Sequence, residues 1–253
     1  SVAPRKNYLS RIASSHDPRE QVLLSNVDRM YVIASIAKPG FSSNRTDRIL
    51  AACLQRNIPA TLIFNKVDID KKGVLDDLRN TYALAGVPIL ETCAIDGYDG
   101  PGMESLRNSL ENKVSAFYGA SGVGKSTLLN AIDPSLKIKV GKISKYWTAG
   151  KHTTTYSQMH KLPIGENSWV IDTPGIRVFR PFGLKRETLR DLFPDFAEFQ
   201  KKCHFPNCTH DHEPDCKVFE GLEAGKIAPT RYGSYVEMLD EIGGTQGHGD
   251  EED

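Results

Sequence analysis

A glycine-rich segment near the middle of the chain carries the clearest chemical signature. It is the run Gly119-Ala120-Ser121-Gly122-Val123-Gly124-Lys125-Ser126, which matches the P-loop pattern G-x-x-x-x-G-K-S/T. In that pattern backbone N–H groups turn toward phosphate oxygens, the lysine reaches the β- and γ-phosphates, and the serine hydroxyl binds Mg²⁺. We therefore expect residues 119–127, ending at Thr127, to bind nucleotide phosphates, with Lys125 also acting in catalysis. The alternative is a glycine-rich turn that arose by chance.

The segments on either side of this run fit the setting that a P-loop requires. Residues 114–118 have the apolar character of a buried strand, and residues 125–132 that of a helix that begins at the loop. This order would aim the helix N-terminus, with its partial positive charge, at a bound phosphate. The context therefore favours the P-loop over a chance turn.

A second polar group, Asn65-Lys66-Val67-Asp68, directly follows a predicted strand at residues 60–64. In an open α/β sheet, ligands bind outside the carboxyl ends of the strands. The group suits guanine, because Asp68 can accept two N–H bonds from the base edge while Asn65 contacts N7 and the Lys66 stem covers the ring. The alternative is a polar turn, and the P-loop in the same chain favours guanine.

A predicted strand at residues 87–90 ends beside a further candidate for base contact. Ala94 is small enough to present its backbone N–H to the guanine carbonyl oxygen. Cys93 is expected to pack beside the base, and we do not assign it as a nucleophile.

Two segments fit the γ-phosphate and Mg²⁺ end of a nucleotide. Asp172-Thr173-Pro174-Gly175 follows a predicted strand at 168–171, and we expect Asp172 to support Mg²⁺ and the Gly175 N–H to bond the γ-phosphate. For this segment alone the alternative is a simple turn. In the segment 150–155 we assign Thr153 to complete the Mg²⁺ coordination and to sense the γ-phosphate.

The segment between these motifs, residues 137–151, is basic and contains no acidic residue. It could be a mobile loop that touches RNA through phosphate contacts and stacking, or a flexible solvated loop. The side chains in question are Lys137, Lys139, Lys142, Lys145, Lys151, Tyr146 and Trp147.

Three of the five cysteines lie close together with a histidine near the C-terminus. Three thiolates and one imidazole form a closed tetrahedral set that suits structural zinc. His204 and His212 lie nearby as alternative ligands, and three free cysteines in a loop are the competing interpretation. The predicted zinc ligands are Cys203, Cys208, His210 and Cys216.

The composition is that of an ordinary globular chain: 253 residues, 39% hydrophobic and 25% charged. Clustered cysteines in an odd total of five indicate metal binding in a reducing compartment, so we expect a cytoplasmic protein. Because no apolar run reaches the ~18 residues of a membrane span, we expect no membrane partner. The formal net charge is +0, so any RNA contact must use a local basic patch.

The chain divides into four predicted parts, of which the second is the α/β nucleotide domain. It should contain a mainly parallel sheet with helices on both faces, including a strand at 30–36 and helices at 46–57 and 72–85. The third part should be a small α-helical zinc-binding domain. The parts are a polar N-terminal arm at 1–27, the nucleotide domain at 28–182, the zinc domain at 183–242 and a disordered acidic tail at 243–253.

The order of the motifs is unusual, because the base-reading segment precedes the P-loop instead of ending the domain. This order, together with Gly-Lys-His-Thr-Thr-Thr at 150–155 and the Cys/His segment, resembles the ribosome-small-subunit-dependent GTPase family (RsgA/YjeQ). The resemblance runs from about residue 4 to residue 242. It implies a circularly permuted P-loop GTPase domain followed by a zinc-binding domain, with GTP/GDP, Mg²⁺ and Zn²⁺ as ligands.

The resemblance also implies a partner and a catalytic residue. Family members act late in maturation of the small ribosomal subunit, contact its rRNA, and hydrolyse GTP faster when the subunit is bound; we expect a monomer. Ile176 stands where many GTPases have a water-orienting Gln, and His152 matches the histidine that the family uses instead, its alternative role being structural. The family usually has an N-terminal OB-fold, and only residues 1 to about 12 resemble its end.

Two other functions compete with this interpretation. A P-loop ATPase or kinase would share the phosphate site, but Asn65 and Asp68 favour GTP. A GTP-gated RNA-binding assembly factor would carry the same motifs, with hydrolysis only incidental.

Overall fold

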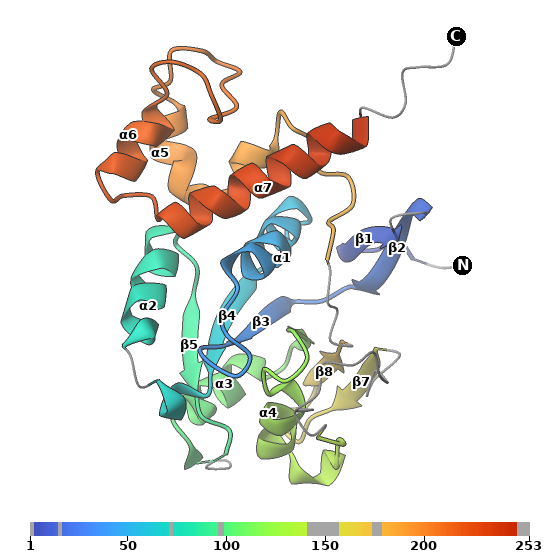
Figure 1. Cartoon of the computed structure of the whole chain (residues 1–253). Coiled ribbons are helices and arrows are strands. Elements are labelled where there is room, and N and C mark those ends of the chain that lie inside the picture. The colour runs from blue at the N-terminus through green and yellow to red at the C-terminus, as the bar shows by residue number, and fades with distance from the viewer. Residues whose placement is uncertain are drawn as a thin grey trace.

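A six-stranded sheet forms the centre of the structure (Figure 1), a computed structural model that describes residues 3–14, 17–70, 73–95, 99–140, 157–173 and 179–246. All neighbouring strands are parallel except the edge strand β7, which is antiparallel to β8. The strand order is β5 (Ile89–Thr92), β4 (Ala60–Asn65), β3 (Arg29–Ser35), β6 (Val114–Tyr118), β8 (Trp169–Asp172) and β7 (Gln158–Lys161).

Helices cover both faces of this sheet, as the apolar run in β3 requires. Alternate residues of a strand point to opposite faces, so a strand buried on both sides is apolar throughout. Met30 and Val32 pack with α1 and α2, whereas Tyr31 and Ile33 pack with α3 and α4. The predicted α/β fold with a mainly parallel sheet is thus confirmed. The helices are α1 (Ser43–Gln55), α2 (Val74–Leu84), α3 (Met103–Leu110) and α4 (Lys125–Ile132), with short 3₁₀ turns at Val67–Ile69 and Pro134–Leu136.

Helix α1 begins three residues before the predicted start at Thr46. Ser42 is its N-cap, and the Ser42 side chain accepts a hydrogen bond from the Arg45 N–H at 3.4 Å. The predicted start relied on apolar periodicity, and the apolar residues of this helix begin only after its first turn. The prediction therefore placed the start of the helix too late.

The N-terminal segment is not a polar arm but a β-hairpin of β1 (Tyr8–Ser14) and β2 (Asp17–Ser25). Leu9 and Leu24 are buried in the same core as α1, and the Ile12 N–H donates to the Arg180 carbonyl oxygen at 2.9 Å. The segment is polar overall, and its sequence alone does not show that Leu9 and Leu24 are buried. Strand β7 was not predicted either, because its short sequence lacks apolar alternation.

The C-terminal part is helical, with α7 lying across α1 (Figure 1). Its core is aromatic and includes Phe193, Phe196 and Tyr235. Helix α7 continues beyond residue 242, through the start of the predicted tail, and no helix in the described part of the chain is long and apolar enough to cross a membrane. The elements are 3₁₀ turns at Leu189–Leu192 and Pro194–Phe196, α5 (Ala197–Gln200), α6 (Lys217–Glu223) and α7 (Pro229–Gln246).

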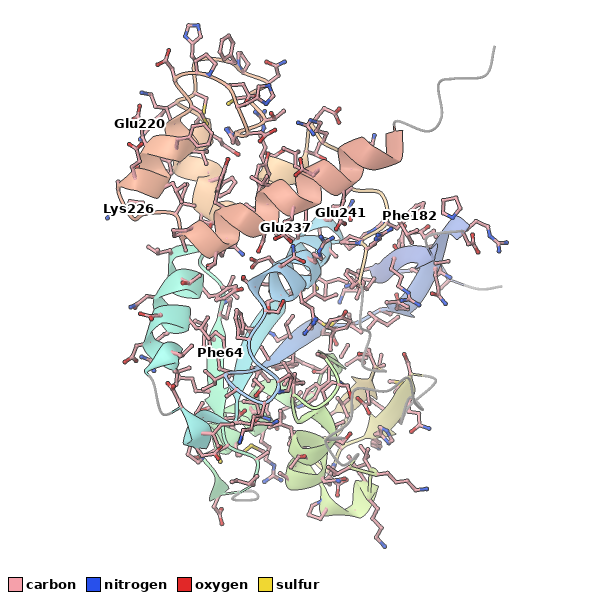
Figure 2. The ribbon with its side chains drawn as sticks, viewed as in Figure 1. Phe64, Phe182, Glu220, Lys226, Glu237 and Glu241 are labelled. Atoms are coloured by element: carbon pink, nitrogen blue, oxygen red, sulfur yellow. The ribbon has the colours of Figure 1, made fainter. Side chains whose placement is uncertain are left out.

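Polar side chains join α7 to α1. Arg231, only 2% exposed, donates to both oxygens of Asp195 and, at 2.7 Å, to Asp47 of α1. Farther along α7, Glu237 accepts from Asn44 and Glu241 pairs with Arg48, and Figure 2 labels both acids where α7 meets α1. The C-terminal part is therefore anchored to the helix that precedes the base-reading strand.

Candidate functional site

The P-loop residues follow β6 and open α4 at the carboxyl edge of the sheet. Gly122 and Gly124 have φ angles of 83° and 104°, a region that side chains disfavour. A Cβ at Gly119 would lie 2.4 Å from the Ile33 carbonyl oxygen, and one at Gly124 would lie 2.3 Å from Asn65 Nδ2. The glycines are therefore required both by the backbone conformation and by the close approach of β3 and the base-reading segment.

Lys125 lies inside the loop that it follows. Its ammonium group donates to the carbonyl oxygens of Gly119 at 2.7 Å and Ala120 at 3.3 Å. Lys125 as a whole is 9% exposed. Burial lowers the pKa of Lys125, and the charge of Asp172 opposes this shift. An ammonium group bonds a charged phosphate oxygen more strongly than a neutral carbonyl oxygen. Lys125 is therefore chemically suited to exchange these carbonyl partners for a phosphate.

Asp172, at the end of β8, is 3% exposed. Its Oδ1 makes no hydrogen bond to any residue that the structure describes. Burial raises the pKa of Asp172, while Lys125 and His160 oppose the rise through their charges. A buried carboxylate oxygen without a partner is chemically suited to the hydrated coordination shell of Mg²⁺.

The base-reading segment is joined to the P-loop by direct hydrogen bonds. Asn65, 1% exposed, donates from Nδ2 to the Val123 carbonyl oxygen at 2.9 Å. Lys66 donates to the carbonyl oxygens of Gly122 and Lys38, each at 2.6 Å, and burial lowers the pKa of Lys66. The structure thus brings together two motifs that lie more than 50 residues apart in the sequence.

Residues at the end of β5 and just after it lie against the base-reading segment. Asp68 is exposed, the Cys93 thiol lies 3.2 Å from Asp68 Oδ1, and Ala94 is 7% exposed. The Thr92 hydroxyl donates to Asn65 Oδ1 at 3.0 Å and was missed by the sequence analysis. Thr92 could be found only from the strand register, which pairs it with Asn65. A local sequence motif does not contain that information.

The remaining predicted residues divide into two sets. Ser121, Ser126 and Thr127 lie in the loop or in the first turn of α4. His152, Thr153 and Gly175 lie outside the described residues, as do residues 141–151, for which RNA contact and a solvated loop were the two interpretations. Their roles stay predictions.

A second site lies in the C-terminal part, where four side chains converge. Cys203, Cys208, His210 and Cys216 place their ligand atoms within 4.8 Å of one another. His210 Nδ1 lies 3.3 Å from Cys216 Sγ and 3.7 Å from Cys203 Sγ, and His210 is fully buried. Burial lowers the pKa of His210 to about 4, which keeps the imidazole neutral, as a metal ligand must be.

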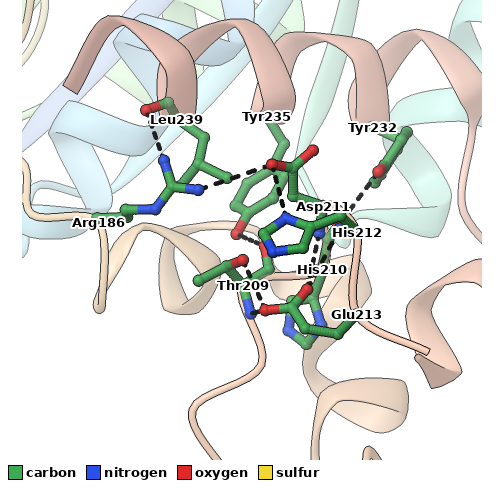
Figure 3. A network of polar contacts seen from close by, with 9 residues as sticks. All are labelled: Arg186, Thr209, His210, Asp211, His212, Glu213, Tyr232, Tyr235 and Leu239. Carbon is green, nitrogen blue, oxygen red and sulfur yellow. Dashed lines mark hydrogen bonds and ion pairs between the residues drawn. The ribbon is translucent and has the colours of Figure 1, made fainter. Parts of the chain in front are cut away.

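The loop around this cluster is organised by polar contacts (Figure 3). Glu213 accepts from the N–H and hydroxyl of Thr209, at 2.5 and 2.7 Å, and from the Asp211 N–H. Burial raises the pKa of Glu213, but these hydrogen bonds outweigh it and lower the value to about 2. Tyr232 donates to the His210 carbonyl oxygen at 2.9 Å, which holds the histidine backbone in its left-handed conformation at φ 57°.

The donor set fits a tetrahedral metal ion of the zinc type. Three thiols and an imidazole, with their ligand atoms within 4.8 Å of one another, would supply all four ligands of a tetrahedral ion. Among the described residues, neither His204 nor His212, the alternative ligands, joins the group.

Comparison with known proteins gives the relatives of this chain. The small ribosomal subunit biogenesis GTPase RsgA 2 of Bacteroides thetaiotaomicron is 38% identical over 243 residues, covering 95% of this chain and 77% of the relative. The small ribosomal subunit biogenesis GTPase RsgA of Chlorobaculum tepidum is 39% identical over 224 residues, covering 88% of this chain and 70% of the relative.

Solved structures share the architecture. YjeQ from Thermotoga maritima superposes with a TM-score of 0.75 at 32% identity, covering 96% of this chain and 78% of that chain. YloQ, described as a circularly permuted GTPase, superposes with a TM-score of 0.71 at 26% identity, covering 97% of this chain and 75% of that chain. The family model described as RsgA GTPase matches residues 2–181, a stretch that includes the P-loop, the base-reading segment and Asp172. With its permuted motif order and this match, the chain belongs to the RsgA GTPase family.

Proposed function

We propose that this chain hydrolyses GTP to GDP and phosphate in the maturation of the small ribosomal subunit. One observation carries the nucleotide assignment: Asn65 and Lys66 are hydrogen-bonded to the P-loop carbonyl oxygens of Val123 and Gly122. A nucleotide that spans both segments would place its base at the base-reading segment and its phosphates at the P-loop. The names of the relatives, which are small ribosomal subunit biogenesis GTPases, support the cellular step.

The proposed phosphate site combines backbone N–H groups of residues 119–127 with the Lys125 ammonium. These donors would stabilise negative charge that grows on the transferred phosphoryl group. Mg²⁺, when bound, would add positive charge at the β- and γ-phosphates, and Ser126, Thr153 and Asp172 are the residues proposed to hold it. The buried Oδ1 of Asp172, which accepts no hydrogen bond from the described residues, supports that role.

The proposed base site explains a preference for guanine. Asp68 would accept the N1–H and N2–H donors of guanine, Asn65 would lie at N7, and the Ala94 N–H would face the carbonyl oxygen. Adenine has a different donor pattern on the same edge. Gly175 would bond the γ-phosphate, and His152 would orient the attacking water.

We further propose that Cys203, Cys208, His210 and Cys216 bind one structural Zn²⁺. Chelation should then loosen residues 200–217, because metal binding and local folding are coupled. Hydrogen exchange with and without a chelator tests this: faster exchange confined to this region is expected. Unchanged exchange, with no metal found by atomic absorption, would contradict the zinc site.

The proposed partner is the small ribosomal subunit with its rRNA, bound by a cytoplasmic monomer. The lysines of segment 137–151 would contact RNA phosphates. They would form the local basic patch through which a chain of +0 net charge can attract RNA. Subunit binding would order the segment around His152 and Thr153 and so stimulate hydrolysis.

The decisive experiment measures GTP hydrolysis by the whole chain with and without purified small ribosomal subunits, with ATP in parallel. We expect hydrolysis of GTP but not ATP, and a higher rate with subunits. Equal rates for both nucleotides would favour a P-loop ATPase or kinase. If a variant that binds GTP without hydrolysing it still matures subunits and leaves them normally, hydrolysis is incidental and the chain is a GTP-gated assembly factor.

A further inference from the structure

A cavity lies beside the P-loop, on the face of the sheet that α1 covers. Its walls come from the end of β3, the loop before α1, the first turn of α1 and the end of β6. The P-loop residues Gly119 and Ala120 line it as well. Their carbonyl oxygens accept hydrogen bonds from Lys125, the residue expected to reach the β- and γ-phosphates. The cavity therefore adjoins the γ-phosphate end of the proposed nucleotide site.

Arg45 brings a positive charge to this cavity. It lines the cavity from the first turn of α1, and its guanidinium makes no hydrogen bond or ion pair within the part of the chain that the structure describes. Arg48, three residues later in the same helix, is paired with Glu241. Among the described residues that line the cavity, none is acidic. Arg45 is thus a cation that lacks an anion.

The N-terminus of α1 adds partial positive charge at the same place. The N-cap residue Ser42 and the first-turn residue Thr46 line the cavity together with Arg45. The first turn of this 13-residue helix contains no acidic residue that would neutralise the helix dipole. A helix N-terminus attracts anions through its partial charge and its free backbone N–H groups.

Tyr118, at the end of β6, contributes a buried hydroxyl to the cavity. The residue is 1% exposed, and its hydroxyl makes no hydrogen bond to any described residue. Burial raises the pKa of Tyr118, and the charges of Arg45 and Arg11 oppose the rise, so the phenol keeps its proton. Because buried hydroxyl groups normally have a hydrogen-bond partner, this proton is available to an acceptor that enters the cavity.

A cation, a helix N-terminus and a hydroxyl donor around one cavity suit a small anion with several acceptor oxygens. We propose that the cavity binds the orthophosphate ion released by GTP hydrolysis, through the Arg45 guanidinium, the N-terminus of α1 and the Tyr118 hydroxyl. The inference rests on the proposed function, because hydrolysis at the P-loop supplies the ion next to the cavity. The ion occupies a position beside the P-loop, separate from that of the γ-phosphate.

The first test is calorimetric titration of inorganic phosphate into the whole chain in two nucleotide states. One sample holds GDP, and the other holds a GTP analogue with an imido group between the β- and γ-phosphorus atoms. We expect phosphate to bind in both states, since the analogue fills the γ-phosphate position and leaves the cavity free. Binding to the GDP sample alone would place the ion in the P-loop and overturn the inference.

The second test removes the donors one at a time. Arg45→Ala should weaken phosphate binding at least about tenfold, and Tyr118→Phe should weaken it about 3- to 10-fold, as expected for a charged and a neutral donor. Arg79→Ala is the control for the arginine, because Arg79 lies in α2. Tyr31→Phe is the control for the hydroxyl, because Tyr31 is equally buried but packs on the opposite face of the sheet. Both controls should leave phosphate affinity unchanged.

The results separate this inference from the proposed function. A wild type that binds GDP but no phosphate, or an Arg45→Ala variant with wild-type phosphate affinity, would overturn the inference and leave the GTPase assignment standing. Thermal unfolding identifies folding defects, and Tyr118→Phe carries the test if Arg45→Ala does not fold. Failure of the wild type to bind GDP would overturn the proposed function, and the inference with it.

Discussion

At the scale of single residues, the nucleotide site is built from close approaches between backbone and side chain. Gly124 lies where a Cβ would be 2.3 Å from Asn65 Nδ2, and Asn65 in turn is oriented by Thr92. The P-loop and the base-reading segment therefore form one unit before any ligand enters. A change that separates them should affect base recognition and phosphate binding together.

Replacement of Gly124 by alanine tests this unit. Gly124→Ala should weaken GDP binding by at least about tenfold, because the added methyl must displace Asn65 in addition to straining the backbone. Gly86→Ala is the control, since Gly86 has φ 65° but no atom within 4 Å of a Cβ. It should cost about 1 kcal/mol of unfolding free energy and leave GDP affinity unchanged. Equal GDP affinities in the two variants would contradict the argument.

At the scale of elements, α1 connects the nucleotide edge to the C-terminal part. The loop before α1 supplies the Lys38 carbonyl oxygen to Lys66, and α1 itself carries Asp47 to Arg231 of α7. The Arg231 guanidinium is almost completely withdrawn from water, so its two carboxylate partners depend on it for their charge balance.

Removal of Arg231 should therefore destabilise the fold strongly. Arg231→Ala would leave Asp47 and Asp195 buried without a cation, at a cost of about 3–5 kcal/mol. Arg79 also contacts two acids, Asp76 and Glu91, but on an exposed surface, so Arg79→Ala should cost less than about 1 kcal/mol. Urea unfolding measures both. Similar midpoints for the two variants would mean that burial does not strengthen the Arg231 contacts.

At the scale of the whole molecule, the chain is a permuted GTPase domain anchored to a helical part with a Cys₃His cluster. Hydrolysis should depend on the partner, because the residue predicted to orient water, His152, directly follows the lysine-rich segment 137–151 proposed to contact RNA. A defect in that residue should appear mainly when the subunit is bound.

His152→Ala should lower subunit-stimulated GTP hydrolysis at least about 100-fold, the lower end of what a side chain positioned for general acid–base catalysis contributes. GDP affinity should change little, since His152 is not among the residues proposed to bind the base or the phosphates. The control is His204→Ala, which alters an exposed histidine outside the Cys₃His cluster. Undiminished turnover in His152→Ala would assign the histidine a structural role.

The sequence by itself determined the features that depend on neighbouring residues. The P-loop spacing, the Asn65–Asp68 segment and the Cys203–Cys216 spacing are local patterns, because phosphate, guanine and zinc each need particular groups within a few residues. The order of these patterns also predicted the permuted α/β fold, which the sheet order and the solved relatives confirm.

Only the tertiary structure decided which distant residues meet. The contact of Cys93 with Asp68 spans 25 positions and that of Arg231 with Asp47 spans 184. Such contacts depend on strand register and helix packing, where a shift of one residue moves a side chain to the other face. For the same reason the hairpin of β1 and β2 was missed: Leu9 and Leu24 become core residues only when the rest of the fold packs against them.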